Sequence, residues 1–192
     1  MHKFLYLTEQ EWVNPWIHGG EVPIFPASTY LARTRYGTQT PDENLIHESP
    51  VDLKSPLLNF LEFQSVNNLT MIGCSSNDVT IPDFYNANYY MEDGLILSFC
   101  NKKSSDICSR LGKKACVKIN DIDFLKGVID SQLGVKGIAK NCGYTQDHQR
   151  NHFLKSIEDA WQDEYRIFWL LQEQRSVLLP EGIGRSIKIK FR

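Results

Sequence analysis

The chain has 192 residues, a formal net charge of −2 and 23% charged residues, which is typical of one globular domain. This balance excludes a chain that is basic throughout, although it allows a local basic face for nucleic acid. No apolar run approaches the length of a membrane span, so we expect no membrane partner.

The cysteines and histidines indicate neither a disulfide framework nor a metal site. The five cysteines are odd in number and no two have CxxC spacing, which predicts free thiols. His148 and His152 are four residues apart, but no acid accompanies them in the HExxH pattern of zinc enzymes, so we expect no metal. Because the N-terminal stretch also lacks the pattern of a signal peptide, we expect a cytoplasmic location.

The first 37 residues predict two short strands, each followed by a helical segment. In chain order, we expect a strand at 4–8, a short helix at 9–18, an extended segment at 21–25 and a helical turn at 27–37. Pro23 favours an edge or irregular position for the second strand, because proline cannot donate to a ladder. Ser28 or Thr29 would cap the helical turn, and Gly37 would end it.

The stretch Thr40-Pro41-Asp42-Glu43 has the pattern of a helix N-terminus. Thr40 would be the cap, Pro41 the first helical residue, and Glu43 would reach back to the cap. We therefore interpret Glu43 as a structural residue rather than a catalytic one.

The remainder of the chain predicts mainly strands. We expect an apolar segment at 57–63, strands at 69–74, 94–100, 115–119 and 186–191, a loop at 83–90 and a helix at 121–133. Helical spacing at 153–161 gives way to a dense aromatic run at 165–171, which favours a helix that breaks before a strand. The alternative is one continuous helix through Leu171. The order of elements predicts a single α+β domain over residues 1–192 rather than a regular βαβ array.

The predicted break falls at Gln162-Asp163-Glu164, where a strand would separate the two acids. Residues two apart share one face of a strand, so Gln162 and Glu164 would point into the same space and Asp163 would point away. Beside an aromatic wall that excludes water, the Glu164 carboxylate is suited to stabilising a developing cation. The competing interpretation is that Glu164 pairs with Arg166 or Lys155 on a surface.

A Gln-x-Glu motif at the start of a late strand, in a domain of this size, resembles the ADP-ribosyltransferase fold. The first strand, Leu5-Tyr6-Leu7-Thr8, and the run from Pro23 to Ile46 are also similar to bacterial toxins of this superfamily, of the DNA-modifying DarT type and the mRNA-modifying CmdT type. The likeness follows the order of elements over most of the chain. It implies two packed, mostly antiparallel sheets with short flanking helices, and cleavage of NAD at the nicotinamide–ribose bond without a metal.

The resemblance implies a role for each site residue. Glu164 would bind a hydroxyl of the nicotinamide ribose and stabilise the cationic transition state, and Gln162 would position the acceptor nucleophile. Arg33 or Arg35 would bind the NAD pyrophosphate, because a guanidinium fork matches phosphate oxygens. The other expected NAD contacts are Thr8, where relatives often have histidine, Ser28, Ser98 and Phe99, with Tyr85, Tyr89 and Tyr90 as alternatives for stacking.

Basic residues in the second half of the chain could form a surface for a nucleic acid. They are Lys102, Lys103, Arg110, Lys113, Lys114, Lys188, Lys190 and Arg192. On their own they are more typical of a solvated strand face, although with nearby aromatic side chains they would also suit a single-stranded nucleic acid. The resemblance implies a nucleic-acid acceptor, and we favour RNA slightly over DNA. The resemblance implies a toxin or phage-defence effector, which could have an antitoxin protein as its partner.

Three other functions stay open at the level of the sequence. A transferase of this type could modify a protein instead of a nucleic acid. The chain could be a non-catalytic binding module whose aromatic residues form an interface. A metal-dependent nuclease would need clustered acids, and the acids at 42–43 and at 121 and 123 have no recognised spacing for one.

Overall fold

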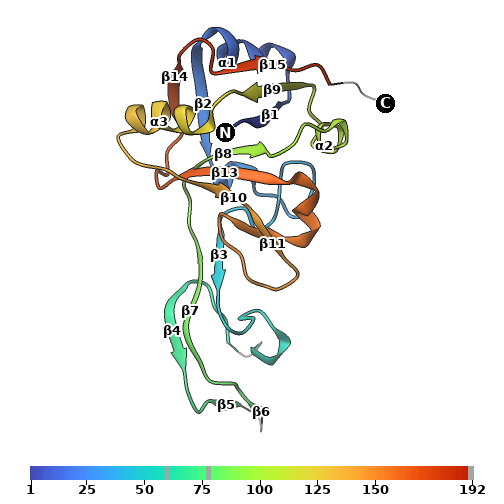
Figure 1. Cartoon of the computed structure of the whole chain (residues 1–192). Helices are drawn as coiled ribbons and strands as arrows, with labels where there is room; N and C mark the ends of the chain where they lie inside the picture. Colours follow the sequence, from blue (N-terminus) through green and yellow to red (C-terminus); the bar gives the residue numbers. More distant parts are fainter. Residues whose placement is uncertain (59–60, 77–78, 190–192) are drawn as a thin grey trace.

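The computed structural model describes residues 1–58, 61–76 and 79–189 and shows a mixed α+β protein with mostly antiparallel sheets (Figure 1). This confirms the α+β class with mostly antiparallel sheets that is expected from the sequence. Among the described residues, the largest sheet has eight strands, with β10-β13-β8-β1-β9-β15 as its main order and β2 and β14 as a branch. None of the helices in this part of the chain has the length and apolar character needed to cross a membrane.

The large sheet and its flanking helices form the body of the molecule (Figure 1). Its strands are β1 (Lys3–Leu7), β2 (Gly20–Pro26), β8 (Leu95–Cys100), β9 (Ala115–Ile119), β10 (Ile138–Asn141), β13 (Glu164–Trp169), β14 (Arg175–Leu179) and β15 (Gly184–Ser186). The helical segments are α1 (Asn14–His18), α2 (Ser105–Arg110) and α3 (Ile122–Leu133), with short 3-10 helices η1 (Gln10–Val13), η2 (Ala27–Tyr30) and η4 (Ile157–Gln162). The strands expected at 4–8, 94–100 and 115–119 and the helix expected at 121–133 are thus confirmed.

The core lies between the large sheet and α3. Ile167 and Trp169 of β13 share one fully buried cluster with Leu125 and Ile129 of α3. The indole nitrogen of Trp169 donates to Asp130 of α3 over 2.6 Å, so the partly polar ring is buried with its hydrogen bond satisfied. Asp121 caps the start of α3, and Gly134 ends it in the left-handed conformation.

One edge of the central strand β8 has a single partner strand, and the other edge has two. Its first edge pairs with β13 over the full length, from Leu95 opposite Trp169 to Cys100 opposite Glu164. On the other edge, β2 pairs with Leu95 and Ile96, and β1 pairs with Cys100 alone. A gap between β1 and β2 therefore opens opposite residues 97–99 of β8. Each part of β2 has a single partner, β14 or β8, which agrees with the edge position that Pro23 indicates.

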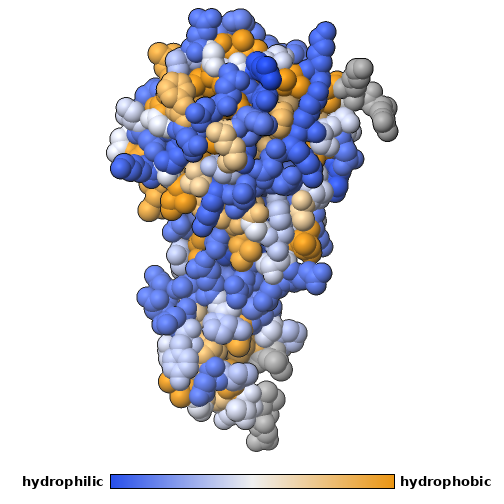
Figure 2. Space-filling model, in the orientation of Figure 1, coloured by the Kyte–Doolittle hydropathy of each residue, from blue (hydrophilic) through white to orange (hydrophobic). Residues whose placement is uncertain are grey.

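Residues 45–91 leave the body as an extension that we call the arm. It contains β3 (Leu45–Glu48), η3 (Pro56–Leu58), β4 (Val66–Met71), β5 (Ser75–Ser76), β6 (Val79–Thr80) and β7 (Phe84–Met91), with β3-β7-β4 as the order of its main sheet. The arm has its own apolar cluster, which includes Leu53, Ile81 and Phe84. Figure 2 shows it as a narrow projection, joined to the body through a strongly hydrophilic band.

The loop expected at 83–90 is wrong, because these residues form the longest strand of the arm. Phe84 and Ala87 are both buried although they are three residues apart. Asn86 has a positive φ of 55°, and the ladder with β4 shifts register between Ala87 and Phe84. This bulge interrupts the two-residue alternation by which a strand is recognised in a sequence.

The helix expected from Thr40 is also wrong. Residues 41–44 form a turn, and the Thr40 hydroxyl donates to the Glu43 carboxylate over 2.8 Å instead of capping a helix. A turn forms instead of a helix because Glu43 pairs with Arg166 of β13. This ion pair holds the Glu43 carboxylate toward the body rather than toward a helix end.

The segment at 153–171 breaks where the aromatic density predicts, but the helix before the break is short. Residues 154–156 form a strand, β12 (Leu154–Ser156), which pairs with β11 (Gly143–Thr145), and only η4 is helical. Asp163 has a positive φ of 47°, which ends η4 and lets β13 begin at Glu164. The continuous helix is therefore excluded.

Two expected segments reach beyond the described residues. Residues 59–60 of the apolar segment at 57–63 and residues 190–191 of the last strand lie outside them. Within the described part, β15 ends at Ser186, and Ile187 and Ile189 pack against the cluster that contains Phe4 and Tyr6.

Gly94 approaches β13 so closely that any side chain there would collide with it. An added Cβ would lie 2.5 Å from Cε2 of Phe168 and 2.6 Å from the carbonyl oxygen of Trp169. We expect Gly94→Ala to lower the free energy of unfolding by about 1–3 kcal/mol, the usual effect of overpacking. Gly127→Ala in α3 is the control, because no described atom lies within 4 Å of its new methyl group. It should raise stability by roughly 0.5–1 kcal/mol. Urea unfolding measures both changes, and equal effects would contradict this packing.

Candidate active site

A cavity of about 520 Å³ opens at the gap between β1 and β2. Its walls come from residues 5–8 of β1 and the turn after it, from β2, and from residues 96–100 of β8. Aromatic side chains line much of it, namely Tyr6, Trp12, Trp16, Phe25, Tyr30 and Phe99. A volume of this size, with a largely apolar surface and a group of polar side chains on one wall, is typical of cofactor and substrate sites.

The gap leaves backbone groups of two strands without a partner strand. Leu95 and Asn101 donate their N–H groups toward the β13 side of β8, so alternation turns the N–H and C=O of Ser98 toward the gap. Leu7 accepts from Lys114 on the β9 side of β1, so the same groups of Tyr6 also face the gap. Among the described strands, none pairs with either residue on that side. A ligand in the cavity therefore meets both donors and acceptors of the main chain.

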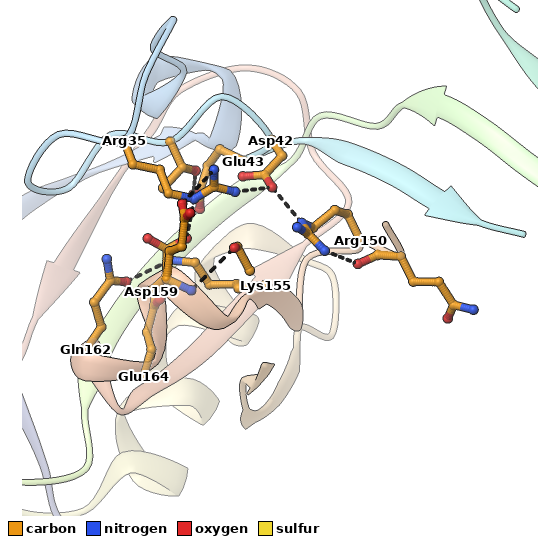
Figure 3. A network of polar contacts seen from close by, with 12 residues as sticks. Arg35, Asp42, Glu43, Arg150, Lys155, Asp159, Gln162 and Glu164 are labelled. Carbon is orange, nitrogen blue, oxygen red and sulfur yellow. Dashed lines mark hydrogen bonds and ion pairs between the residues drawn. The ribbon is translucent and has the colours of Figure 1, made fainter. Parts of the chain in front are cut away.

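Three buried polar side chains meet on one wall of the cavity (Figure 3). Glu164 begins β13, Gln162 ends η4, and Lys155 lies in the middle of β12. The Lys155 ammonium donates to Oε1 of Gln162 over 2.7 Å and to Oε2 of Glu164 over 2.8 Å. All three residues are less than 7% exposed, so these bonds form away from bulk water.

Arg166 extends this wall into a network of four buried charges. Its Nε donates to Oε1 of Glu164 over 2.7 Å, and its terminal nitrogens bond to Glu43 and to the carbonyl oxygen of His152. Two cations, Lys155 and Arg166, thus balance the two carboxylates. Buried charges are tolerated only when they are paired and hydrogen-bonded in this way.

The network keeps Glu164 ionised inside the protein. Burial on its own would raise the pKa of this carboxyl group, but Arg166 and Lys155 lower it from its usual 4.5 to about 2. A negative charge is therefore held at the cavity wall at all physiological pH values. A preorganised charge of this kind acts most strongly on a cation that develops where water is excluded.

The expected separation of the two acids is confirmed. Gln162 and Glu164 both line the cavity, and Asp163 does not. Asp163 instead accepts from Asn101 over 3.0 Å and pairs with Lys102 over 3.4 Å. The competing interpretation of Glu164 holds in part, since it does pair with Arg166 and Lys155, but it does so in the cavity wall rather than on a surface.

The structure brings some of the other expected NAD contacts to the cavity. Thr8, Ser98 and Phe99 line it. The Thr8 hydroxyl accepts from Lys113 over 2.9 Å, and Lys113 lines the cavity too. Ser98 has an exposed side chain, whereas Phe99 is only 1% exposed and is part of the core.

Arg33, Arg35 and Ser28 do not line the cavity. Arg35 pairs with Asp42 over 2.7 Å, Asp159 over 3.2 Å and Glu158 over 3.4 Å (Figure 3). Arg33 is exposed, and Ser28 donates its backbone N–H to Asp93 over 2.9 Å. Arg35 is therefore engaged with carboxylates, which leaves Arg33 as the more accessible of the two arginines.

Both arginines lie on a flap, residues 31–40, beside the cavity. Tyr30, which directly precedes the flap, and Thr38, near the tip of the flap, line the cavity. A Cβ added to Gly37 would lie 3.8 Å from the carbonyl oxygen of Leu111, so the tip lies against the end of α2. The ion pairs of Arg35 with η4 fasten the flap in this position.

Sequence reasoning missed Lys155 and Glu43 as parts of the site. Lys155 was expected in a helix and considered only as a surface partner of Glu164. The sequence does contain a signal for a contact at Glu43, because the threonine three residues earlier bonds to it. That bond lies in a turn, however, and does not cap a helix. Tyr85, Tyr89 and Tyr90 belong to β7 in the arm and do not line the cavity.

The expected basic residues gather in part around α2. Lys102 and Lys114 form exposed ion pairs with Asp163 and Glu9, and the guanidinium of Arg110 stacks on Trp161 at 3.8 Å. Lys103, which follows Lys102, is exposed. Lys188 lies near the end of the described residues, and Lys190 and Arg192 lie outside them.

Comparisons of this chain with protein-family models, with curated proteins and with solved structures found no match. The geometry of the cavity therefore carries the functional argument. Its distinctive parts are an ionised, buried carboxylate, an amide held beside it, and free main-chain groups in an aromatic pocket.

The depressed pKa of Glu164 predicts a specific loss of stability in acid. In the unfolded chain a glutamate takes up its proton near pH 4.3, whereas folded Glu164 stays ionised to about pH 2. The contribution of ionised Glu164 to the free energy of unfolding is therefore fully present above about pH 4.5 and is lost as the pH falls toward 2. We expect Glu164→Gln to lower stability by roughly 3–5 kcal/mol at pH 7, because Lys155 and Arg166 lose a buried partner. Its stability should also depend less on pH below about 4.5. Urea unfolding between pH 7 and pH 2.5 measures both effects.

Glu173→Gln is the control for this measurement. Glu173 pairs with Arg175 on the surface, with side chains that are 78% and 49% exposed. Its replacement should change stability by less than about 1 kcal/mol. Parallel pH dependence in wild type and Glu164→Gln would contradict the role given to the network.

Proposed function

We propose that this protein is an NAD-dependent ADP-ribosyltransferase with an ADP-ribosyltransferase-like fold, and that it modifies single-stranded nucleic acid, with RNA favoured over DNA. The observation that carries the proposal is the ionised Glu164 beside Gln162 on the wall of a cavity that opens in a split sheet. The reaction breaks the bond between ribose C1′ and the nicotinamide nitrogen. Nicotinamide leaves with the electron pair, an acceptor atom bonds to C1′, and the acceptor's proton passes to water.

The charge on Glu164 suits this chemistry. As the C1′–N bond breaks, positive charge develops on the ribose, and a nearby carboxylate stabilises it, as in glycoside cleavage. Each oxygen of Glu164 accepts one hydrogen bond, from Lys155 or from Arg166. Each oxygen keeps a further lone pair, so a ribose hydroxyl can bond to Glu164 without breaking the network.

The gap between β1 and β2 suits the nicotinamide group. A carboxamide has one acceptor oxygen and one donor nitrogen, which match the free C=O and N–H of Tyr6 or Ser98. Phe25 and Tyr30 line the same cavity and are only half-buried, so they offer faces for ring stacking, whereas Phe99 belongs to the core. For the pyrophosphate, Lys113 at the cavity and Arg33 on the flap are the cations that we favour.

The residues around α2 suit a nucleic-acid acceptor. Trp161 directly precedes Gln162 in η4, and its ring carries the guanidinium of Arg110. Lys103 is exposed in the loop before α2. Exposed ion pairs such as Lys102–Asp163 contribute little stability, so phosphate groups can replace the carboxylates. An enzyme that consumes NAD and modifies nucleic acid would harm its host, and we therefore propose a toxin or phage-defence effector that is controlled by an antitoxin protein.

A protein acceptor or a non-catalytic binding module is the second candidate. Residues 45–91 contain five acidic residues and one lysine, which disfavours nucleic acid on the arm. Tyr85 is 54% exposed there, and exposed tyrosines are enriched in protein interfaces. Under the non-catalytic reading, the Glu164 network would be purely structural.

Binding and cleavage of NAD test the main proposal. NAD should raise the melting temperature of the protein, because it binds only the folded state. Glu164→Gln should lower the rate of nicotinamide release by about 10²-fold or more, the usual effect of removing a preorganised electrostatic group. Asp163→Asn is the matched control, because Asp163 points away from the cavity and asparagine tolerates its positive φ. It should keep nearly the full rate.

Incubation with labelled NAD and separate pools of RNA, DNA and protein identifies the acceptor. We expect label in RNA first. Label in protein alone would support the second candidate, and a folded protein that neither binds nor consumes NAD would overturn the enzyme proposal. Expression in cells provides a further readout, since wild type should be poorly tolerated and Glu164→Gln should be tolerated.

A further inference from the structure

Three of the five histidines of the chain lie where the arm joins the body. They are His47 in β3, and His148 and His152 in residues 147–152, a segment that we call the clasp. The clasp is fastened to the base of the arm through the main chain, because His47 and Arg150 exchange backbone hydrogen bonds of 2.8 and 3.0 Å. A change in histidine charge would therefore act first on this joint.

The clasp also reaches the charges of the cavity wall. Nε of Arg150 donates to Asp42 over 2.6 Å, and the next residue, Glu43, pairs with Arg166 (Figure 3). The carbonyl oxygen of His152 accepts from Arg166 over 3.0 Å. The joint and the network around Glu164 are thus connected through two contacts of the clasp.

The contacts of His148 suit a positively charged ring. Its Nδ1 lies 2.5 Å from the Asp147 carboxylate, and its Nε2 lies 2.9 Å from the carbonyl oxygen of Ser49. Both partners are acceptors. A neutral imidazole has one N–H and can fill only one of these contacts, whereas an imidazolium donates to both.

The neighbouring ring of His47 has the opposite arrangement and suits the neutral form. Its Nε2 accepts the backbone N–H of Leu53 over 3.4 Å, so this nitrogen carries no proton. The residue is only 3% exposed, and its ring packs edge-on against Tyr89. The centroids of the His47 and His148 rings are 4.7 Å apart, so two charged rings here would repel each other.

The charges around His47 also oppose its protonation. Burial lowers its pKa most, and His148, Arg150 and Lys54 lower it further, against a smaller opposing effect of Asp52. The pKa of His47 falls in this way from 6.5 to about 4. An opened joint would return His47 to its ordinary pKa and so bind a proton that the closed joint excludes. The closed joint is therefore fully favoured above about pH 6.5 and loses this advantage as the pH falls toward 4.

We propose that His47 and His148 make the base of the arm an acid-sensitive joint, in which protonation of His47 breaks the bond from Leu53, places two cations side by side and frees the arm from the clasp. This inference goes beyond the proposed transferase function and does not depend on it. Release of the clasp would also withdraw Arg150 from Asp42, so acid loosens the support of the cavity wall together with the arm.

Hydrogen exchange at the two backbone N–H groups of the joint, those of His47 and Arg150, tests the proposal. The protection factor compares observed with intrinsic exchange, which removes the ordinary effect of pH on the exchange rate. A move of the pKa from 6.5 to about 4 predicts that protection falls about 20-fold between pH 7 and pH 5. His47→Gln keeps an acceptor for Leu53 but takes up no charge, so its protection should change by less than about twofold.

Two further variants separate the roles of the histidines. His18→Gln is the matched control, because His18 is exposed at the end of α1 in the body, and it should keep the wild-type fall. His148→Gln removes the second cation, so the fall should be smaller than in wild type. Imidazole signals in nuclear magnetic resonance give a test that needs no variant, since His47 of the wild type should still be mainly neutral at pH 5.

Three results would contradict the joint. The first is an equal fall in protection at Leu95 and Lys114, whose backbone N–H groups bond within the body, because the acid effect would then be global unfolding. The second is a full 20-fold fall in His47→Gln, which would assign the effect to another group. The third is a wild type in which His47 is charged at pH 5 while its backbone N–H stays protected.

Discussion

Arg166 holds two carboxylates from distant parts of the chain, and the site depends on this buried junction. Glu43 comes from the turn before the arm and Glu164 from the first residue of β13, while Lys155 adds a second cation from β12. Loss of Glu164 would leave Lys155 buried without an ion-pair partner, and loss of Arg166 would do the same to Glu43, so the four residues depend on one another. The same junction that joins these segments also sets the ionisation of Glu164 and the direction of Gln162, so stability and chemistry share one set of contacts.

Local patterns in the sequence predict most of the body of the fold. Strands such as β8 and β9 are mainly apolar, with one polar residue each, and α3 has both a capping aspartate and a terminal glycine. The arm was harder to predict from the sequence, because the bulge at Asn86 interrupts the alternation of buried and exposed residues in β7. The turn at 41–44 was harder still, because its capping pattern is real but Arg166 draws Glu43 into a tertiary ion pair. Local rules fail here because a distant charge outweighs them.

The candidate site was predictable to the extent that it depends on strand alternation. The sequence predicts that Gln162 and Glu164 meet and that Asp163 points away, but the physical reason differs, because Gln162 ends η4 and Asp163 has a positive φ before β13 begins. Lys155 could not be placed, since its position depends on a strand pairing with residues 143–145 that no local pattern indicates. Arg35 has a side chain suited to phosphate, but it contacts three acids, one from the turn at 41–44 and two from η4.

The arm begins and ends at the same point of the body, since Leu45 and Met91 are directly paired across β3 and β7. Its apolar cluster is separate from the core of the body. A segment with adjoining ends and its own interior can be lengthened, shortened or exchanged during evolution while the rest of the chain keeps its path. Selection can therefore change the surface that the arm presents without moving the residues of the cavity, which lie outside it.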